Sequence, residues 1–196
     1  LMDFRTDQLD GINFIYVLPY SKSRALIEST SFSTRPQNCE EHSQSVRKYI
    51  AENYHGDFKI KAEESGQLPM TTRTFPTKSG DRVFNIGIAG GNARPSSGYA
   101  FHRIQRHASS IAKAIVSRQN IPTTFANPKY NFFDDVFLNL ISENPIAAKD
   151  AFLCLFDKVP ADILIRFLSD ESSYADDLAI ITALPKISFG RLGLKT

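Results

Sequence analysis

The sequence has few cysteines and histidines, no long apolar run and almost no net charge. Its 196 residues include 23 Lys and Arg against 21 Asp and Glu, which gives a formal net charge of +2. That charge is too small to indicate a nucleic-acid-binding protein. No apolar stretch approaches the roughly 20 residues that a membrane-spanning helix needs. With 42% hydrophobic and 22% charged residues, the composition is typical of a soluble globular chain.

The cysteines and histidines give no sign of a disulfide or a metal site. Cys39 and Cys154 lie far apart among residues with helical patterns, which favours buried thiols in a reducing compartment. The four histidines, at positions 42, 55, 102 and 107, show no spacing typical of metal ligands. A Gly-x-Gly-x-x-Gly fingerprint followed by an acidic residue is also absent, so these residues contain no site for the adenosine half of a dinucleotide.

The clearest β signal lies near the start of the chain. Two β-prone runs, Ile12 to Pro19 and Ser23 to Thr30, are separated by a connection of hairpin length, which predicts an antiparallel pair. Side chains alternate along a strand, so the carboxyl of Glu28 shares a face with apolar neighbours. Such a glutamate is either a structural strand residue that forms an ion pair with Arg24 or Lys22, or a catalytic acid.

The remaining elements follow from local patterns. A helix should begin at Asn38 and end before Gly56, and Phe58 to Ala62 alternates like a half-exposed strand. After a linker marked by Pro122 and Pro128, apolar spacing predicts four helices. The first has an apolar face from Phe132 to Ile141 and stops near Asn144-Pro145. The others span Ala147 to Lys158, Pro160 to Leu168 and Tyr174 to Ala183. The phenylalanines of the first either pack as an ordinary helical cap or form an apolar mouth at a membrane surface.

A glycine-rich turn carries most of the functional information. Arg82 to Ile88 has the pattern of a short buried strand, and Phe101 to Ile115 repeats at helical spacing, so the turn joins a strand to a helix. Backbone N–H groups at a helix start suit an anion, and glycines allow a ligand to approach closely, while one of the serines would cap the helix. The residues concerned are Gly90, Gly91, Pro95, Ser96, Ser97 and Gly98. Taken alone, the pattern fits a cofactor-binding turn and an ordinary capped helix equally well.

Four motifs, in order along the chain, resemble those of the lycopene cyclases, a branch of the FAD-dependent, aromatic-hydroxylase-like flavoproteins. They are Met2-Asp3-Phe4-Arg5, Tyr16-Val17-Leu18-Pro19 followed by Leu26-Ile27-Glu28-Ser29-Thr30, Gly66-Gln67-Leu68-Pro69-Met70, and Pro95-Ser96-Ser97-Gly98-Tyr99. Beyond about residue 118 the resemblance fades to a pattern of amphipathic helices. Ser97 replaces the family's usual Thr, and Ser29 stands where plant-type cyclases have a second Glu.

The resemblance implies an α/β (α+β) fold that forms the C-terminal part of such a flavoprotein. Residues 1–80 would form a substrate-binding sheet region with a crossing helix, residues 81–120 the closing part of the FAD-binding domain, and residues 121–196 a helical C-terminal cap. Because the chain opens on Leu1 inside the first motif, we expect a longer protein whose N-terminal dinucleotide-binding portion is missing here. Residues 1–196 alone are then expected to be inactive.

The implied reaction is a redox-neutral, proton-initiated ring closure of the linear ends of lycopene, in the intramolecular lyase or isomerase class. Glu28 aligns with the first Glu of the family motif, held essential there, and would be the general acid, with Glu63 and Glu64 in reserve. Alkenes are poor bases, so such an acid must stay protonated until it is used, and burial among apolar groups raises the pKa of a carboxyl. The substrate pocket would be lined by Asp3, Arg5, Leu68, Pro69 and Met70.

The resemblance also implies a cofactor, a substrate and a location. The residues of the glycine-rich turn would contact FAD in its reduced form, with NAD(P)H as the indirect reductant. The partner would be a lipophilic polyene, and the protein would be cytoplasmic and peripherally associated with a membrane. Two alternatives stay open: an FAD-dependent hydroxylase or prenyl reductase on the same scaffold, and a non-catalytic, truncated carotenoid-binding remnant. Glu28 in its motif favours the cyclase over the first alternative.

Overall fold

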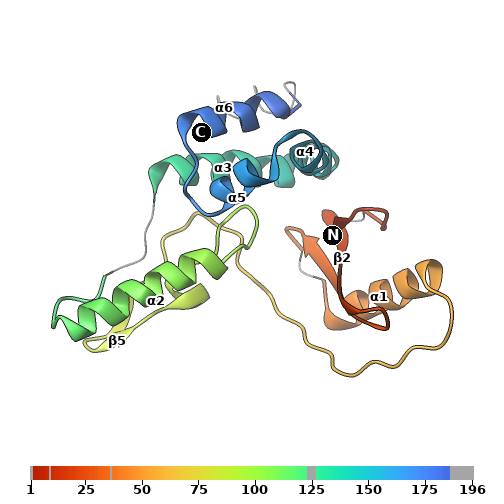
Figure 1. Cartoon of the computed structure of the whole chain (residues 1–196), viewed down its shortest axis with the longest axis horizontal. Coiled ribbons are helices and arrows are strands. Elements are labelled where there is room, and N and C mark those ends of the chain that lie inside the picture. Colours follow the sequence, from red (N-terminus) through yellow and green to blue (C-terminus); the bar gives the residue numbers. More distant parts are fainter. Residues whose placement is uncertain (1, 9, 36, 123–126, 186–196) are drawn as a thin grey trace. The chain divides into compact units, whose positions relative to one another are not determined.

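A computed structural model describes residues 2–8, 10–35, 37–122 and 127–185 (Figure 1). The chain divides into two compact units, each discontinuous in sequence. The first consists of Leu1–Gln67 and Ile141–Asp150, and the second of Leu68–Leu140 and Ala151–Thr196. The mixture of helices and small sheets agrees with the predicted α/β class.

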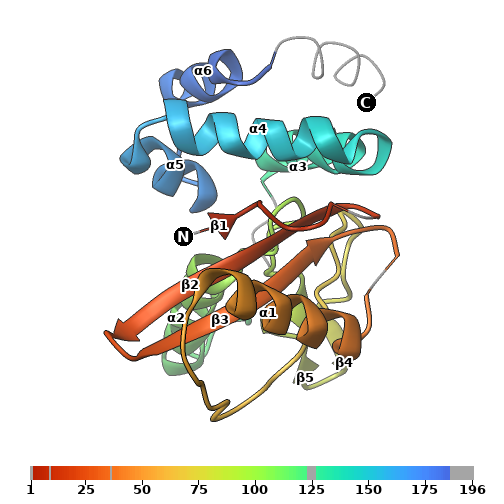
Figure 2. The same ribbon diagram turned by 90° about the vertical axis from the view of Figure 1, so that its right-hand side faces the viewer.

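The first unit is built on a three-stranded antiparallel sheet (Figure 2). Its strands are β1 (Met2–Asp3), β2 (Ile12–Ser21) and β3 (Arg24–Phe32), in the order β1-β2-β3. β2 and β3 form the predicted hairpin, with an irregularity in the register between Pro19 and Ser21. The apolar residues Ile12, Phe14 and Ile15 are almost fully buried, so both faces of β2 contribute to the core.

Helix α1 (Cys39–Asn53) packs against β3 and confirms the predicted helix start. The Asn38 Oδ1 atom accepts a hydrogen bond from the Glu41 N–H at 3.0 Å, and the Glu41 Oε2 atom accepts one from the Asn38 N–H at 2.7 Å. This reciprocal pair satisfies two donors that the helix itself cannot pair. Tyr49 is the buried residue on the inward face of α1.

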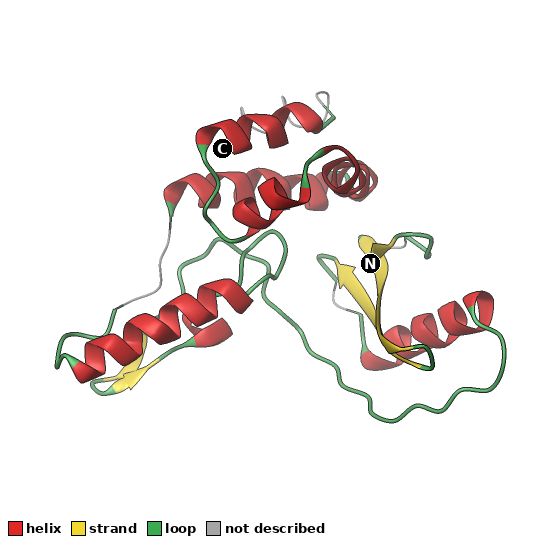
Figure 3. Cartoon of the chain, viewed as in Figure 1, coloured by secondary structure: helices red, strands yellow, loops and turns green. Residues whose placement is uncertain are grey.

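Two expectations for this region are wrong. Residues 54–77 contain neither helix nor strand, so Phe58 to Ala62 does not form the predicted strand (Figure 3). An alternating pattern becomes a strand only where a neighbouring strand pairs with it, and in the described part of the chain none does. Cys39 is exposed rather than buried, and its Sγ atom lies 3.1 Å from the Ser65 Oγ atom, while Cys154 is partly buried and also free.

The second unit begins with a small hairpin, β4 (Lys78–Gly80) and β5 (Val83–Phe84), followed by the 3₁₀ turn η1 (Gly87–Gly90) and helix α2 (Phe101–Val116). The helix is predicted correctly, but the buried strand Arg82 to Ile88 is not. β5 has two residues, and Val83 and Ile86 are each 58% exposed. Among the described residues β4 alone pairs with β5, so the apolar run lacks the neighbours that would bury it.

The helical part of the chain follows the sequence prediction closely. It consists of α3 (Pro128–Glu143), α4 (Pro145–Lys158), α5 (Ala161–Leu168) and α6 (Tyr174–Ala183). In the second unit the phenylalanines pack against one another. The rings of Phe137 and Phe152 meet edge to face with centroids 4.8 Å apart, and those of Phe133 and Phe167 are tilted with centroids 5.7 Å apart. These contacts favour the packing interpretation for most of the phenylalanines. In the described part of the chain, no helix has the length and apolar character to cross a membrane.

Candidate functional site

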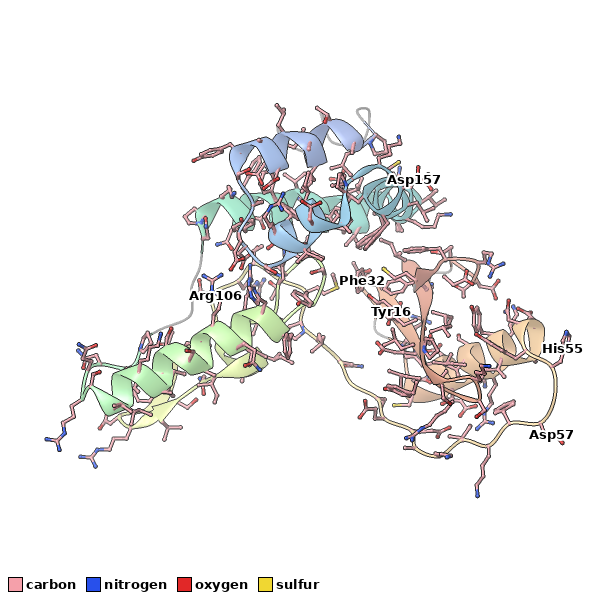
Figure 4. All side chains as sticks on the ribbon, viewed as in Figure 1. Tyr16, Phe32, His55, Asp57, Arg106 and Asp157 are labelled. Carbon is pink, nitrogen blue, oxygen red and sulfur yellow. The ribbon has the colours of Figure 1, made fainter. Side chains whose placement is uncertain are left out.

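Glu28 belongs to a row of side chains that crosses the sheet of the first unit. It lies opposite Tyr16 of β2, which pairs on its other side with Met2 of β1. Directly opposite residues of antiparallel strands point to the same face, so these three side chains are neighbours. Phe14, next along this face, packs edge-on against the rings of Tyr16 and Phe32, with centroids 5.1 and 5.4 Å away. Tyr16 and Phe32 are labelled in Figure 4. We call this surface, with Met2, Phe14, Tyr16, Glu28 and Phe32, the acid face.

The Glu28 carboxyl lies exposed on the acid face. Its Oε1 atom accepts a hydrogen bond of 3.0 Å from the Thr30 hydroxyl. Arg24, a predicted partner in the structural alternative, instead lies over the Tyr20 ring, 5.7 Å from its centroid. Burial, and then the negative charge of Glu28, raise the pKa of the Tyr16 phenol. The predicted face is therefore present, but the described residues do not bury the carboxyl.

Asp3 lies on the opposite face of the same sheet. It pairs with Ile15, which pairs with Ser29, and this row faces α1. The Asp3 carboxylate accepts hydrogen bonds from the Arg5 guanidinium, at 2.6 Å for the shortest, and from the Tyr49 hydroxyl at 2.9 Å. These bonds, mainly those from Arg5, hold the pKa of Asp3 well below its usual range. Asp3 and Arg5 thus anchor α1 on the sheet and are separated from Glu28 by the sheet itself.

The substitution Asp3→Asn is expected to make the folding stability depend less on pH in the acid range. Because the pKa of Asp3 is lower in the folded chain than in the unfolded chain, its contribution to stability is present above about pH 4 and is lost as the pH falls further. Denaturant titrations of Asp3→Asn at several pH values should therefore show a stability deficit at neutral pH that narrows below about pH 4. Asp57→Asn, in the exposed loop after α1, is the control. A deficit that did not change with pH would contradict this role.

The reserve acids and the third motif lie in the long loop. Glu63 is exposed, with its Oε1 atom 3.6 Å from an Arg47 nitrogen, and Glu64 is exposed as well. Leu68 packs on the glycine-rich turn, since a Cβ atom at Gly98 would lie 3.3 Å from the Leu68 Cδ1 atom. Pro69 is exposed and Met70 is half-buried. The structure therefore brings Leu68 of the third motif against Gly98 of the fourth, both in the second unit.

The glycine-rich turn is closed by its own backbone. Gly91 and Gly98 have φ values of +78° and +69°, a conformation that favours glycine. The Gly98 N–H donates to the Arg94 carbonyl and the Arg94 N–H to the Tyr99 carbonyl, both at 2.8 Å. The N–H groups of Gly90, Gly91 and Ser97 also donate to carbonyl oxygens of the same loop. These N–H groups therefore donate within the loop itself.

The serines do not cap α2 as predicted, because the chain makes a complete extra turn before the helix starts. The N-cap residue is Ala100, and Ser97 accepts a hydrogen bond from the Tyr99 N–H at 3.3 Å. Ser96 is buried, as is Pro95, and its hydroxyl donates to the Asp134 carboxylate at 2.5 Å.

The start of α2 fits one edge of a flavin better than the glycines do. Ala100 has no side chain that could accept hydrogen bonds from the first N–H groups of this 16-residue helix. Those donors and the positive end of the helix dipole suit an electron-rich ligand edge. At Gly98 the absence of a side chain leaves this position open, since a Cβ atom would lie 3.3 Å from the Leu68 Cδ1 atom. The residues present therefore fit an FAD contact at the helix start.

A buried ion pair fastens this turn to the helices, and sequence reasoning missed it. Arg94 and Asp134 have side chains that are 1% and 0% exposed, and the Arg94 Nε atom lies 2.9 Å from the Asp134 Oδ1 atom. The guanidinium also donates to the Phe167 carbonyl and lies 4.1 Å from the centroid of the Phe167 ring. The one available signal was an acidic residue, Asp134, within the phenylalanine-rich face predicted for α3.

A second pair strengthens the same connection. Arg103 of α2 binds the Asp170 carboxylate through two nitrogens, at 2.5 and 2.9 Å. Asp170 has a left-handed φ of 60° in the turn after α5, and one of its oxygens lies 3.9 Å from Arg94. The middle of the turn and the helix that follows it are therefore each held by a carboxylate of the helical segment. Among the described residues, no three His, Cys, Asp or Glu side chains form a cluster that could hold a metal ion.

Comparison with known proteins identifies the family. The family model described as "Lycopene cyclase protein" matches residues 1–193. The chain is 25% identical over 203 residues to the lycopene beta-cyclase of Pantoea ananas, covering 95% of this chain and 52% of that protein. It is 24% identical over 216 residues to the lycopene beta-cyclase of a Paracoccus species, covering 97% and 52%, respectively.

A chloroplastic lycopene beta cyclase of Arabidopsis thaliana is 28% identical over 138 residues, which cover 63% of this chain and 26% of that protein. No solved structure matches the chain. The chain spans about half the length of the two bacterial relatives. Because the family model covers nearly every residue, the chain belongs to the lycopene cyclase family.

Proposed function

We propose that these residues supply the acid and one flavin contact of a carotenoid cyclase that closes the linear ends of lycopene into rings. The exposed position of Glu28 opposite the half-buried Tyr16, within a family motif, carries this proposal. The reaction is redox-neutral and requires a proton donor beside an apolar surface. Glu28 and its neighbours Tyr16 and Met2 provide that combination.

The chemistry assigned to Glu28 is a proton transfer to carbon. Its carboxyl gives a proton to a terminal alkene carbon, and the alkene's electron pair forms the new C–H bond. The carbocation that remains is attacked by the neighbouring alkene, which closes the ring. A proton then leaves an adjacent carbon for the carboxylate or for water, so no electrons are gained or lost.

The substrate itself would complete the surroundings of the acid. The carboxyl is exposed to water, which solvates and favours its ionised form. An apolar polyene lying on the acid face would displace that water and favour the protonated form. The half-buried ring of Tyr16 would then present π electrons to the developing cation.

The flavin contact is assigned to the start of α2, with Gly98 and Leu68 beside it. When bound, reduced FAD would supply a fixed negative charge, with NAD(P)H as the indirect reductant. The first N–H groups of α2 would orient the electron-rich edge of the cofactor. Arg94 and Arg103 hold the turn in place through Asp134 and Asp170.

Gly98→Val is expected to lower the FAD content of the purified, complete protein. A β-branched residue resists the φ of +69° and its Cβ atom would press on Leu68. Flavin absorbance per protein chain measures the effect. Gly80→Val is the matched control, because Gly80 lies in β4, has no left-handed φ and would make only ordinary contacts with Val83. Equal flavin content in the two variants would argue against a contact at Gly98.

The test of the proposed function is expression of the complete gene in a lycopene-accumulating host, with the pigments separated by chromatography. Cyclised carotenes are expected, and their ring type identifies the carbon that loses the proton. Oxygenated or reduced pigments would instead support the hydroxylase or prenyl reductase alternative. Unchanged lycopene in the presence of folded, flavin-loaded protein would support the non-catalytic alternative.

We also infer that the protein works at a membrane surface, where its lipophilic substrate dissolves. Helix α6 exposes Tyr174, Leu178 and Ile181, which follow one another at helical spacing and suit an interfacial position. Sedimentation of the protein with lipid vesicles, compared with a variant that carries serine at Leu178 and Ile181, measures this association. Equal sedimentation of the two proteins would contradict a role for α6.

A further inference from the structure

Thr30 and Glu28 lie two residues apart on β3, so their side chains share the acid face. The Thr30 Oγ1 atom donates a hydrogen bond of 3.0 Å to the Glu28 Oε1 atom. Thr30 itself is half-buried and pairs with Phe14, whose ring is almost fully buried. The hydroxyl is therefore attached to a rigid part of the sheet, and its β-branched side chain has few rotamers.

The carboxyl of a glutamate is separated from the backbone by three rotatable bonds, so an exposed one samples many positions. A proton transfer to carbon requires the carboxyl to be in one position beside the alkene. Restricting the carboxyl to that position beforehand lowers the entropic cost of the transfer. The hydroxyl hydrogen of Thr30 is bonded to the Oε1 atom of Glu28. The proton that Glu28 donates must then reside on Oε2.

We propose that Thr30 is the positioning residue of the acid: its hydroxyl holds the Oε1 atom of Glu28 and leaves Oε2 to carry the transferred proton. This inference rests on the proposed role of Glu28 as the acid. Thr30 does not touch the reacting carbons and acts through the carboxyl. Its contribution should therefore appear in the rate and its pH dependence more than in substrate affinity.

Two variants separate the hydroxyl from the shape of the side chain. Thr30→Val removes the hydroxyl and keeps the β-branch, whereas Thr30→Ser keeps the hydroxyl. With the complete flavin-loaded protein and reduced FAD, Thr30→Val is expected to lower kcat about 10-fold or more with little change in KM. Thr30→Ser should restore most of kcat. Ser29→Ala, which removes a hydroxyl from the opposite face beside His42, is the matched control.

The pH dependence of the rate is a second measurement, because a purely structural role of Thr30 would leave it unchanged. The rate falls as the pH rises and the acid ionises. A hydroxyl that donates to a carboxylate favours the ionised form, so its loss in Thr30→Val should displace the fall in rate to higher pH. Tyr16, the titratable group facing Glu28 from β2, has a raised pKa and stays protonated over this range, and Arg24 on β3 lies against Tyr20.

The outcomes distinguish this inference from the proposed function. If Glu28→Gln abolishes cyclisation while Thr30→Val matches the unaltered enzyme in kcat and pH dependence, the role of Thr30 is overturned and that of Glu28 stands. If Glu28→Gln remains active, the proposed acid is wrong whatever Thr30 does. Equal losses in Thr30→Val and Thr30→Ser without a displaced pH profile would assign Thr30 a packing role and also overturn the inference.

Discussion

Asp134→Asn is expected to lower the free energy of unfolding by about 3 to 5 kcal/mol, the largest stability effect of any single substitution considered for this chain. Asparagine has nearly the shape of aspartate but no charge, so it would leave the Arg94 guanidinium buried without its counter-ion. Asp170 lies 3.9 Å from Arg94 but is bound at shorter distance by Arg103, and it cannot replace Asp134. Denaturant titration at neutral pH measures the loss.

Two further variants show whether the loss arises from the buried charge. Replacing the pair together, with Arg94→Met and Asp134→Leu, removes both charges and should recover much of the stability that the single variant loses. Glu171→Gln breaks an ion pair of 3.8 Å with Arg106 whose side chains are 53% and 43% exposed, and should cost less than about 1 kcal/mol. If Asp134→Asn cost no more than Glu171→Gln, the buried pair would not be what holds the turn.

Glu28→Gln is expected to reduce cyclisation by about 100- to 10,000-fold, the contribution typical of a positioned general acid. Glutamine keeps the size of the side chain and can still accept the Thr30 hydrogen bond, but it cannot donate a strong proton. Folding and FAD content should be unchanged, because the side chain is exposed. Glu28→Asp should retain a trace of activity, since the acid remains but lies one methylene too far away.

The assay requires reduced FAD and chromatographic separation of the carotenes. Glu52→Gln, an exposed carboxyl near the end of α1, is the control and should cyclise lycopene at the unaltered rate. Full activity of Glu28→Gln would make Glu28 a structural strand residue. Glu64 would then be the next candidate, ahead of Asp3, which is engaged by Arg5 and Tyr49 on the other face of the sheet.

The parts of the fold that could be predicted from sequence depend on short-range signals. The hairpin of β2 and β3 follows from two β-prone runs with a short connection, and the start of α1 from Asn38 and Glu41, three residues apart. In the same way Asn144 and Pro145 separate α3 from α4. In each case the decisive partners lie within a few residues of one another.

The expectations that failed depend on partners far away in sequence. Phe58 to Ala62 and Arg82 to Ile88 have strand-like patterns, but a pattern does not specify which strand will pair with it. Arg94 and Asp134 are 40 residues apart, and composition alone gives no reason to bring them together. The serine caps failed for a local reason, because the turn closed by Arg94 delays the start of α2 to Phe101.

In the first hairpin, the length of the turn decides which face of the sheet carries the Glu28 carboxyl. Tyr16 faces Glu28 because β2 and β3 are aligned by the two residues between Ser21 and Arg24. Insertion or loss of one residue there would shift the alignment by one position and exchange the two sides of β3. Ile27 or Ser29, depending on the direction of the shift, would then stand beside Tyr16, and the carboxyl would turn toward α1. An odd change in turn length would therefore remove the acid from its surface without altering any residue of the motif, whereas an even change would preserve it.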